Sequence, residues 1–92
     1  MESFYLYVLK STVVDRKYIG ISEDPLKRLR QHNSGHVRST KAYAPWELVR
    51  QEEHPSKTDA RKMELCLKGN SWKRKELFAR IDQTLVAPSS NG

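Results

Sequence analysis

The sequence predicts a small α+β domain with three short strands and three helices. Three segments rich in aromatic and branched residues predict the strands: residues 4–10, 17–21 and 46–53. Capping signals ahead of three other segments predict the helices. The chain has 92 residues, which fits one compact domain and leaves no room for two. We therefore expect a helical layer on each apolar face of a single sheet.

The first two strands bring two tyrosines together. If Leu6 and Val8 face the main helical layer, the two-residue period of a strand puts Tyr7 on the opposite face. The same parity places Tyr18 and Gly20 of the second strand on that face, where the glycine leaves open space. The two phenols then lie near each other, either as ordinary cross-strand packing or as functional groups.

A clear start signal precedes the first helix. Ser22 or Asp24 can cap it, and Pro25 suits the first helical position. The Asn-Ser-Gly sequence at residues 33–35 ends it.

Arg28 and His32 are four residues apart and so lie on one face of this helix, beside Leu29. The arginine is either a surface cation whose stem covers apolar side chains or a clamp for a phosphate. His32 can pack, titrate or hydrogen-bond a phosphate oxygen. Spacing alone favours a surface position for both.

Residues 36–45 are polar, basic and without a periodic pattern, which predicts a loop before the third strand. After that strand, Ser56 and Asp59 resemble a capping box and predict a helix that runs to about Lys68.

Glu64 lies at the edge of the apolar stripe of this second helix, which is formed by Ala60, Met63 and Leu67. A carboxylate facing such a seam is costly unless it is paired or binds a metal. One interpretation is an ion pair with Arg28. The other is a hard oxygen ligand for Mg²⁺, which takes one or two carboxylates and keeps its waters.

A last helix, which Ser71 can cap, is expected to run to about residue 85. A flexible tail follows at residues 87–92, so that residues 1–86 form the single domain. Its predicted buried stripe is Leu77, Phe78, Ile81 and Leu85. Three cations crowd its first turns, against the macrodipole: Lys73, Arg74 and Lys75. A bound phosphate would relieve this conflict, and a later helix start would remove it.

The composition indicates the class of binding partner and the cellular compartment. The net charge of +6 favours polyanions, and Arg38 and Lys41 in the predicted loop add to the basic clusters. No apolar run approaches the roughly 20 residues of a membrane span, and the start does not resemble a secretory signal. The single cysteine, Cys66, is expected to be a small buried residue in a reducing, cytoplasmic environment. We expect a monomer with no small-molecule cofactor.

Two of these segments resemble the paired motif of the GIY-YIG nuclease superfamily: Tyr-Leu-Tyr at residues 5–7 and Tyr-Ile-Gly at residues 18–20. The helix that contains Arg28 is similar to the family's arginine-bearing helix. Trp-Glu-Leu-Val at residues 46–49 matches the third strand of its small single-domain members, and Ala-Arg-Lys-Met-Glu at residues 60–64 resembles the helix with the metal-binding glutamate. The catalytic domain of the excision-repair nucleases belongs to the same superfamily.

The resemblance implies a three-stranded antiparallel sheet flanked by helices, and hydrolysis of phosphodiester bonds in DNA, as in repair or recombination. It implies Mg²⁺ or Mn²⁺ at Glu64 and, by position, a catalytic set of Tyr7, Tyr18, Arg28 and His32. A tyrosinate at Tyr7 or Tyr18 would take the proton of the attacking water, and we favour Tyr7 as the base and Tyr18 as its orienter. A free phenol titrates near pH 10, so positive charge from Arg28, the metal or Lys17 would have to lower its pKa.

Three departures from the family pattern leave other functions open. Tyr5 replaces the first motif glycine, Ile21 stands where the excision-repair branch has a lysine, and no second DNA-binding domain is present. An alternative function is a non-catalytic nucleic-acid-binding module with a degenerate site. It would keep the basic residues Arg38, Lys41, Lys73, Arg74 and Lys75. A further alternative is a protein-interaction domain that docks through Tyr43 or Trp72.

Overall fold

The sheet has three antiparallel strands, as predicted. The computed structural model describes residues 3–90, and the side chains of residues 3–83. The strands are β1 (Phe4–Ser11), β2 (Lys17–Ser22) and β3 (Trp46–His54), in the order β2-β1-β3. The helices are α1 (Pro25–Asn33), α2 (Lys57–Gly69) and α3 (Ser71–Ser90), with a short 3₁₀ turn at Lys41–Tyr43. The predicted α+β class is confirmed.

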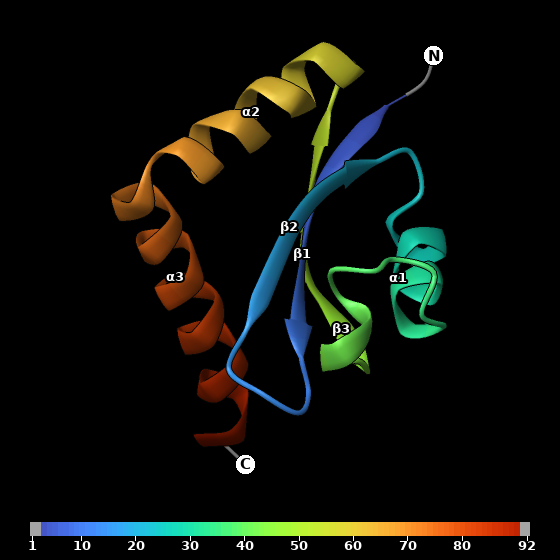
Figure 1. The fold of residues 1–92 in the computed structure, drawn as a ribbon. Helices are drawn as coiled ribbons and strands as arrows, with labels where there is room; N and C mark the ends of the chain where they lie inside the picture. Colours follow the sequence, from blue (N-terminus) through green and yellow to red (C-terminus); the bar gives the residue numbers. More distant parts are fainter. Residues whose placement is uncertain (1–2, 91–92) are drawn as a thin grey trace.

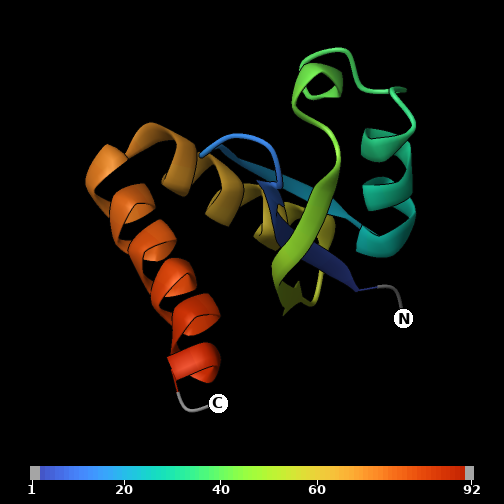
Figure 2. The same ribbon diagram turned by 90° about the horizontal axis from the view of Figure 1, so that it is seen from below.

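Helices cover both faces of the sheet, so the central strand β1 is buried on both of its faces. Figures 1 and 2 show α1 on one side of the sheet and the α2–α3 pair on the other. The register places Tyr7 opposite Gly20 and Val8 opposite Ile19. Successive residues of β1 therefore point alternately into two different layers.

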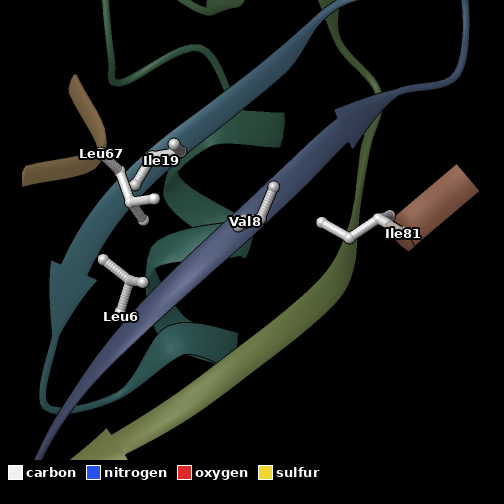
Figure 3. Close-up of a cluster of buried hydrophobic side chains, with 5 residues drawn as sticks. All are labelled: Leu6, Val8, Ile19, Leu67 and Ile81. Atoms are coloured by element: carbon white, nitrogen blue, oxygen red, sulfur yellow. The ribbon is translucent and has the colours of Figure 1, made fainter. Parts of the chain in front are cut away.

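One of these layers is an apolar core between the sheet and the α2–α3 pair. It contains Leu6, Val8, Ile19, Leu67 and Ile81, which Figure 3 shows converging from β1, β2 and the two helices. All five are at most 7% exposed. This cluster confirms the predicted strand parity and the apolar stripe of the last helix as far as Ile81.

The layer on the α1 side is built around Tyr7, Leu9 and Trp46. The chain between α1 and β3 is fastened to this layer at Trp46. The Asn33 amide donates to the Trp46 carbonyl at 3.0 Å and accepts from the Trp46 backbone N–H, while the Trp46 indole N–H donates to the Thr40 carbonyl at 2.9 Å. The predicted loop is confirmed apart from its 3₁₀ turn, and Tyr43 of that turn also packs against this layer.

The capping residues are largely those that the sequence predicts. The Asp24 carboxylate accepts from the Lys27 N–H at 3.2 Å, and the Ser56 hydroxyl accepts from the Asp59 N–H at 3.2 Å. The predicted cap of α3 is wrong by one residue: the Asn70 side chain, and not that of Ser71, accepts from the helix, through the Lys73 N–H at 3.0 Å.

Three other expectations differ from the structure. Met63 is 37% exposed, so the α2 stripe is carried by Ala60 and Leu67 alone. Cys66 is exposed and not buried. α3 extends to Ser90, beyond its predicted end at residue 85, so residues 87–90 of the predicted tail are helical. The predicted Leu85 contact lies outside the described side chains, and residues 91–92 lie outside the described chain.

A clasp of opposite charges joins α3 to the β1–β2 hairpin. The Lys17 ammonium lies 3.1 Å from Oδ1 of Asp82, and the Lys10 ammonium lies 3.5 Å from the same oxygen. The Lys17 side chain is only 5% exposed, because Phe78 also packs against it.

No helix in the described part of the chain has the length and apolar character needed to cross a bilayer.

Candidate active site

Tyr7 lies in the middle of the α1 layer, directly over Gly20. A Cβ atom at position 20 would fall 2.6 Å from the Tyr7 hydroxyl oxygen, so only glycine leaves room for the phenol. The Tyr7 side chain is fully buried, and its ring centroid lies 6.3 Å from that of Tyr18 on the neighbouring strand. The predicted pairing of the two phenols is present.

His32 is buried between the two tyrosines and the loop after α1, so the predicted surface position is wrong. Its Nε2 lies 3.2 Å from the Tyr7 hydroxyl, and its Nδ1 lies 2.7 Å from the Thr40 hydroxyl. Its ring centroid is 4.8 Å from that of Tyr18. Burial lowers the pKa of His32, and the positive charge of Arg28 lowers this pKa further. The imidazole is therefore neutral at pH 7.

Arg28 is half-buried one turn before His32 and faces the same phenol. The Gln31 side-chain oxygen accepts from its guanidinium at 2.6 Å and fixes its direction. Burial raises the pKa of Tyr7, while a hydrogen bond from Arg28 and its positive charge act in the opposite direction. Burial is the larger effect, so the phenol stays protonated at neutral pH in the free protein.

Glu64 reaches the site from α2, around the edge strand β2. Its charge acts on the Tyr7 phenol, whose pKa it raises, as Tyr18 also does. Glu64 is paired with Lys68 at 3.0 Å, one turn later, so the ion pair with Arg28, one of the two interpretations of the sequence, is not the one that forms. The Lys68 ammonium stands 5.7 Å from the centroid of the Tyr18 ring, which links α2 to the tyrosine pair.

The structure thus brings four of the five residues predicted for the chemistry into one cluster: Tyr7 from β1, Tyr18 from β2, and Arg28 and His32 from α1. The fifth, Glu64, lies on α2 and acts on the same phenol through its charge. Such an arrangement can hold a phosphate against a guanidinium while a phenol–imidazole pair accepts a proton.

The surroundings of Glu64 suit Mg²⁺ better than a metal ion whose ligands are all protein side chains. Its side chain is 12% exposed and offers two hard oxygens beside the tyrosine pair. No group of three or more His, Cys, Asp or Glu side chains that could hold a metal occurs among the described residues. Mg²⁺ is commonly held by one or two carboxylates together with substrate phosphates and water, whereas structural zinc needs a closed set of four ligands. We therefore find the donor set compatible with Mg²⁺ or Mn²⁺.

The predicted nucleic-acid-binding residues fall into two groups on the two sides of the β2 edge. Arg38 and Lys41 are exposed on the loop that covers His32. Lys73 and Lys75 are exposed on the first turns of α3. A pocket of about 220 Å³ opens beside Tyr18, and its lining includes Lys68 and Arg74.

Arg74 has a structural role that the sequence did not reveal. Its guanidinium donates to the carbonyl oxygens of Leu67 and Lys68, at 3.2 and 2.9 Å, and so caps the C-terminus of α2. This contact gives one of the three cations a partner without a bound phosphate, whereas Lys73 and Lys75 stay exposed near the N-terminus of α3. Lys17 is likewise occupied, since it pairs with Asp82, so Arg28 is the cation that acts on the Tyr7 phenol.

Two residues near the site were missed by sequence reasoning. Lys68 could have been found, because it stands four residues after Glu64 and such pairs face each other on a helix. Thr40 could not, because it lies in a segment without periodicity and meets His32 only through the fold of the loop.

Comparison with known proteins identifies the family. The sequence pattern of the GIY-YIG catalytic domain matches residues 3–76. UPF0213 protein Reut_B5558 from Cupriavidus pinatubonensis is 35% identical over 82 residues, which cover 87% of this chain and 90% of that protein. The solution NMR structure of the UPF0213 protein BH0048 from Bacillus halodurans has a TM-score of 0.52 and 29% identity, covering 86% of this chain and 84% of that one.

A shorter match concerns a much larger protein. The structure-specific endonuclease subunit SLX1 homolog from Giardia intestinalis is 49% identical over 37 residues, which are 37% of this chain and 10% of that protein. This chain therefore matches only about a tenth of the length of that relative. The profile match over most of the chain, together with the shared fold, shows that the chain belongs to the GIY-YIG nuclease family.

Proposed function

We propose that this protein is an endonuclease that hydrolyses phosphodiester bonds in DNA with the help of Mg²⁺ or Mn²⁺. The observation that carries the proposal is the cluster of a guanidinium, two phenols and an imidazole described above, together with a carboxylate whose charge acts on one of the phenols. Membership of a nuclease family supports the reaction class. The match to part of a structure-specific endonuclease subunit supports internal cleavage of a nucleic-acid strand, and DNA as the substrate, with repair or recombination as the setting, is part of this proposal.

In this proposal Arg28 binds the non-bridging oxygens of the scissile phosphate. Gln31 already holds the guanidinium in place at 2.6 Å, so little ordering is needed when the substrate arrives. A fixed cation of this kind stabilises the charge that develops on a phosphate during displacement. Glu64 would hold the divalent cation, which supplies Lewis-acid stabilisation of the phosphate when it is bound. Lys68 would then be released from Glu64.

The proton of the attacking water goes to the Tyr7–His32 pair. Burial raises the pKa of Tyr7, so we do not assign a pre-formed tyrosinate as the base. The Tyr7 oxygen instead takes the proton of the water while its own hydrogen passes to Nε2 of His32, 3.2 Å away. The water oxygen loses one proton as it bonds to phosphorus, and the Tyr7 oxygen gains one proton and gives up one. His32 holds the extra proton while the bond between phosphorus and the leaving oxygen breaks, and releases it when product leaves. Tyr18, whose ring packs at a tilt against the rings of Tyr7 and His32, orients them.

A second function, DNA binding without cleavage, is favoured by one observation. The Glu64 carboxylate is already paired with Lys68, and this pair would have to open before a metal could bind. Exposed cations on both sides of the β2 edge would still bind a phosphate backbone, with affinity that falls steeply as salt rises.

Nicking of supercoiled plasmid by Glu64→Gln tests the proposal. We expect wild-type protein to nick with Mg²⁺ or Mn²⁺ and not with EDTA, and Glu64→Gln to lose at least about 10²-fold in rate while it still folds and binds DNA. The control is Glu47→Gln, an exposed glutamate on the far edge strand, which should cut like wild type. Single-stranded, branched and RNA substrates in the same assay define the preferred substrate. Equal cleavage by Glu64→Gln and wild type would refute the assignment, and salt-sensitive binding without any cleavage would favour the second function.

A further inference from the structure

Thr40 lies against the side of His32 that faces away from Tyr7. Its side chain is buried, at 3% exposure, and its hydroxyl oxygen is 2.7 Å from Nδ1 of His32. We infer that Thr40 is a positioning residue: its hydroxyl accepts the Nδ1 hydrogen of His32, so that the Nε2 lone pair points to the Tyr7 phenol. The consequence for catalysis rests on the proposed function, but the tautomer is a property of the free protein.

A count of the buried hydrogens supports this direction. A neutral imidazole carries one hydrogen on its two ring nitrogens. If Nδ1 carries it, the Tyr7 hydroxyl donates to Nε2, Nδ1 donates to Thr40, and the Thr40 hydroxyl donates to the Val37 carbonyl at 3.3 Å. Every hydrogen in this series of hydrogen bonds then has an acceptor.

The opposite direction leaves one hydrogen without a partner. If the Thr40 hydroxyl donated to Nδ1, Nε2 would carry the hydrogen and donate to the Tyr7 oxygen. The Tyr7 hydrogen would then need another acceptor, and His32 is the only hydrogen-bond partner of this hydroxyl in the described part of the chain that could accept it. In the free protein the fully buried Tyr7 hydroxyl is also closed to bulk water, which would reach it only once substrate opens the site. An unsatisfied buried donor costs about 1–3 kcal/mol, which favours the first tautomer.

The backbone around Thr40 holds its hydroxyl in this place. Its N–H donates to the Val37 carbonyl at 3.2 Å, and its own carbonyl accepts from the Trp46 indole at 2.9 Å. Trp46 is itself buried and fastened to Asn33, so the loop cannot drift away from His32. The loop between α1 and β3 thus fixes the protonation pattern of a histidine that it does not contain.

The tautomer matters because only one of the two can serve the proposed proton path. With Nε2 unprotonated, His32 can receive the Tyr7 hydrogen. With Nε2 protonated, the same nitrogen is a donor and the path is closed. Loss of residues that orient a functional histidine typically costs about 10- to 100-fold in activity.

Nitrogen NMR of the histidine side chains in the free protein tests the tautomer. Long-range ¹H–¹⁵N correlation spectra near pH 7.5 separate protonated from unprotonated ring nitrogens, and His32→Gln assigns the signals. We expect a protonated Nδ1 and an unprotonated Nε2 in wild type. Thr40→Val keeps the volume but removes the acceptor, so it should move the population toward protonated Nε2. Thr40→Ser should restore the wild-type pattern.

Cleavage rates complete the test. Thr40→Val should nick plasmid about 10- to 100-fold more slowly than wild type, with Thr40→Ser close to wild type. A wild-type spectrum with protonated Nε2 overturns the inference even if Thr40→Val does not fold. A shifted tautomer in Thr40→Val with unchanged cleavage overturns the positioning role. Wild-type protein that cuts no DNA refutes the proposed function alone, and the spectra still decide the tautomer.

Discussion

The two faces of strand β1 differ in what their buried side chains do. On the α2–α3 side, Leu6 and Val8 pack into a cluster that is entirely apolar. On the α1 side, Tyr7 is just as buried, but its hydroxyl is hydrogen-bonded to His32 and faces Arg28. Alternate residues of one strand therefore supply stability to one layer and polar groups to the other. The difference shows that one strand of a small sheet can serve an apolar core on one face and a buried polar cluster on the other.

The largest expected effect is on the apolar face. Leu6→Ala should destabilise the fold by about 2–5 kcal/mol, since it removes buried methyl groups and leaves a cavity among Val8, Ile19 and Leu67. Urea unfolding monitored by circular dichroism measures this loss. Below the unfolding transition, cleavage per folded molecule should stay unchanged. The matched change on the other face, Tyr7→Phe, should cost less stability but abolish cleavage, and loss of cleavage in folded Leu6→Ala would contradict this division.

An intermediate effect is expected at Gly20, on the site face. In Gly20→Ala the new methyl group would lie 2.6 Å from the Tyr7 hydroxyl oxygen and 3.0 Å from the Tyr18 ring. Overpacking of this kind costs about 1–3 kcal/mol, and here it also displaces the phenol from His32. Gly69→Ala is the control, because a methyl group there meets no atom within 4 Å. Equal unfolding midpoints for the two variants would show that the Tyr7 ring can move freely.

The smallest expected effect is a pH dependence of stability just below neutrality that comes from the site face. The pKa of His32 is lowered in the folded protein, so below about pH 6.5 the unfolded chain binds a proton that the folded one resists. Stability should therefore fall as the pH drops below this value. Between pH 7.5 and pH 5.5 the urea midpoint of His32→Gln should fall less than that of wild type. The midpoint of the exposed His36→Gln should fall as much as that of wild type. If His32→Gln lost as much stability as wild type, the pH dependence would come from another group.

Sequence reasoning succeeded where a strict period operates. The two-residue period of a strand placed Tyr7, Tyr18 and Gly20 on one face, and the helical period placed Arg28 with His32. These are backbone rules that hold whatever the side chains touch.

Predictions from the sequence failed where the burial of a residue depends on a segment without a hydrophobic period. His32 is fully buried because the loop with Thr40 folds over it, and no pattern in residues 36–45 encodes that fold. The roles of Arg74 and Lys17 were missed for the same reason, since each depends on how separate elements come together in space.

The charged clasp at Asp82 also has a consequence for how the domain comes apart. The Asp82 side chain as a whole is 47% exposed, but its Oδ1 atom, which faces both ammonium groups, is buried. Dissolved ions screen a buried pair much less than an exposed one, so concentrated salt should leave this anchor of the C-terminal helix largely in place. Acid should loosen α3 instead, because protonation of Asp82, whose pKa the hydrogen bond and charge of Lys17 lower, removes the attraction.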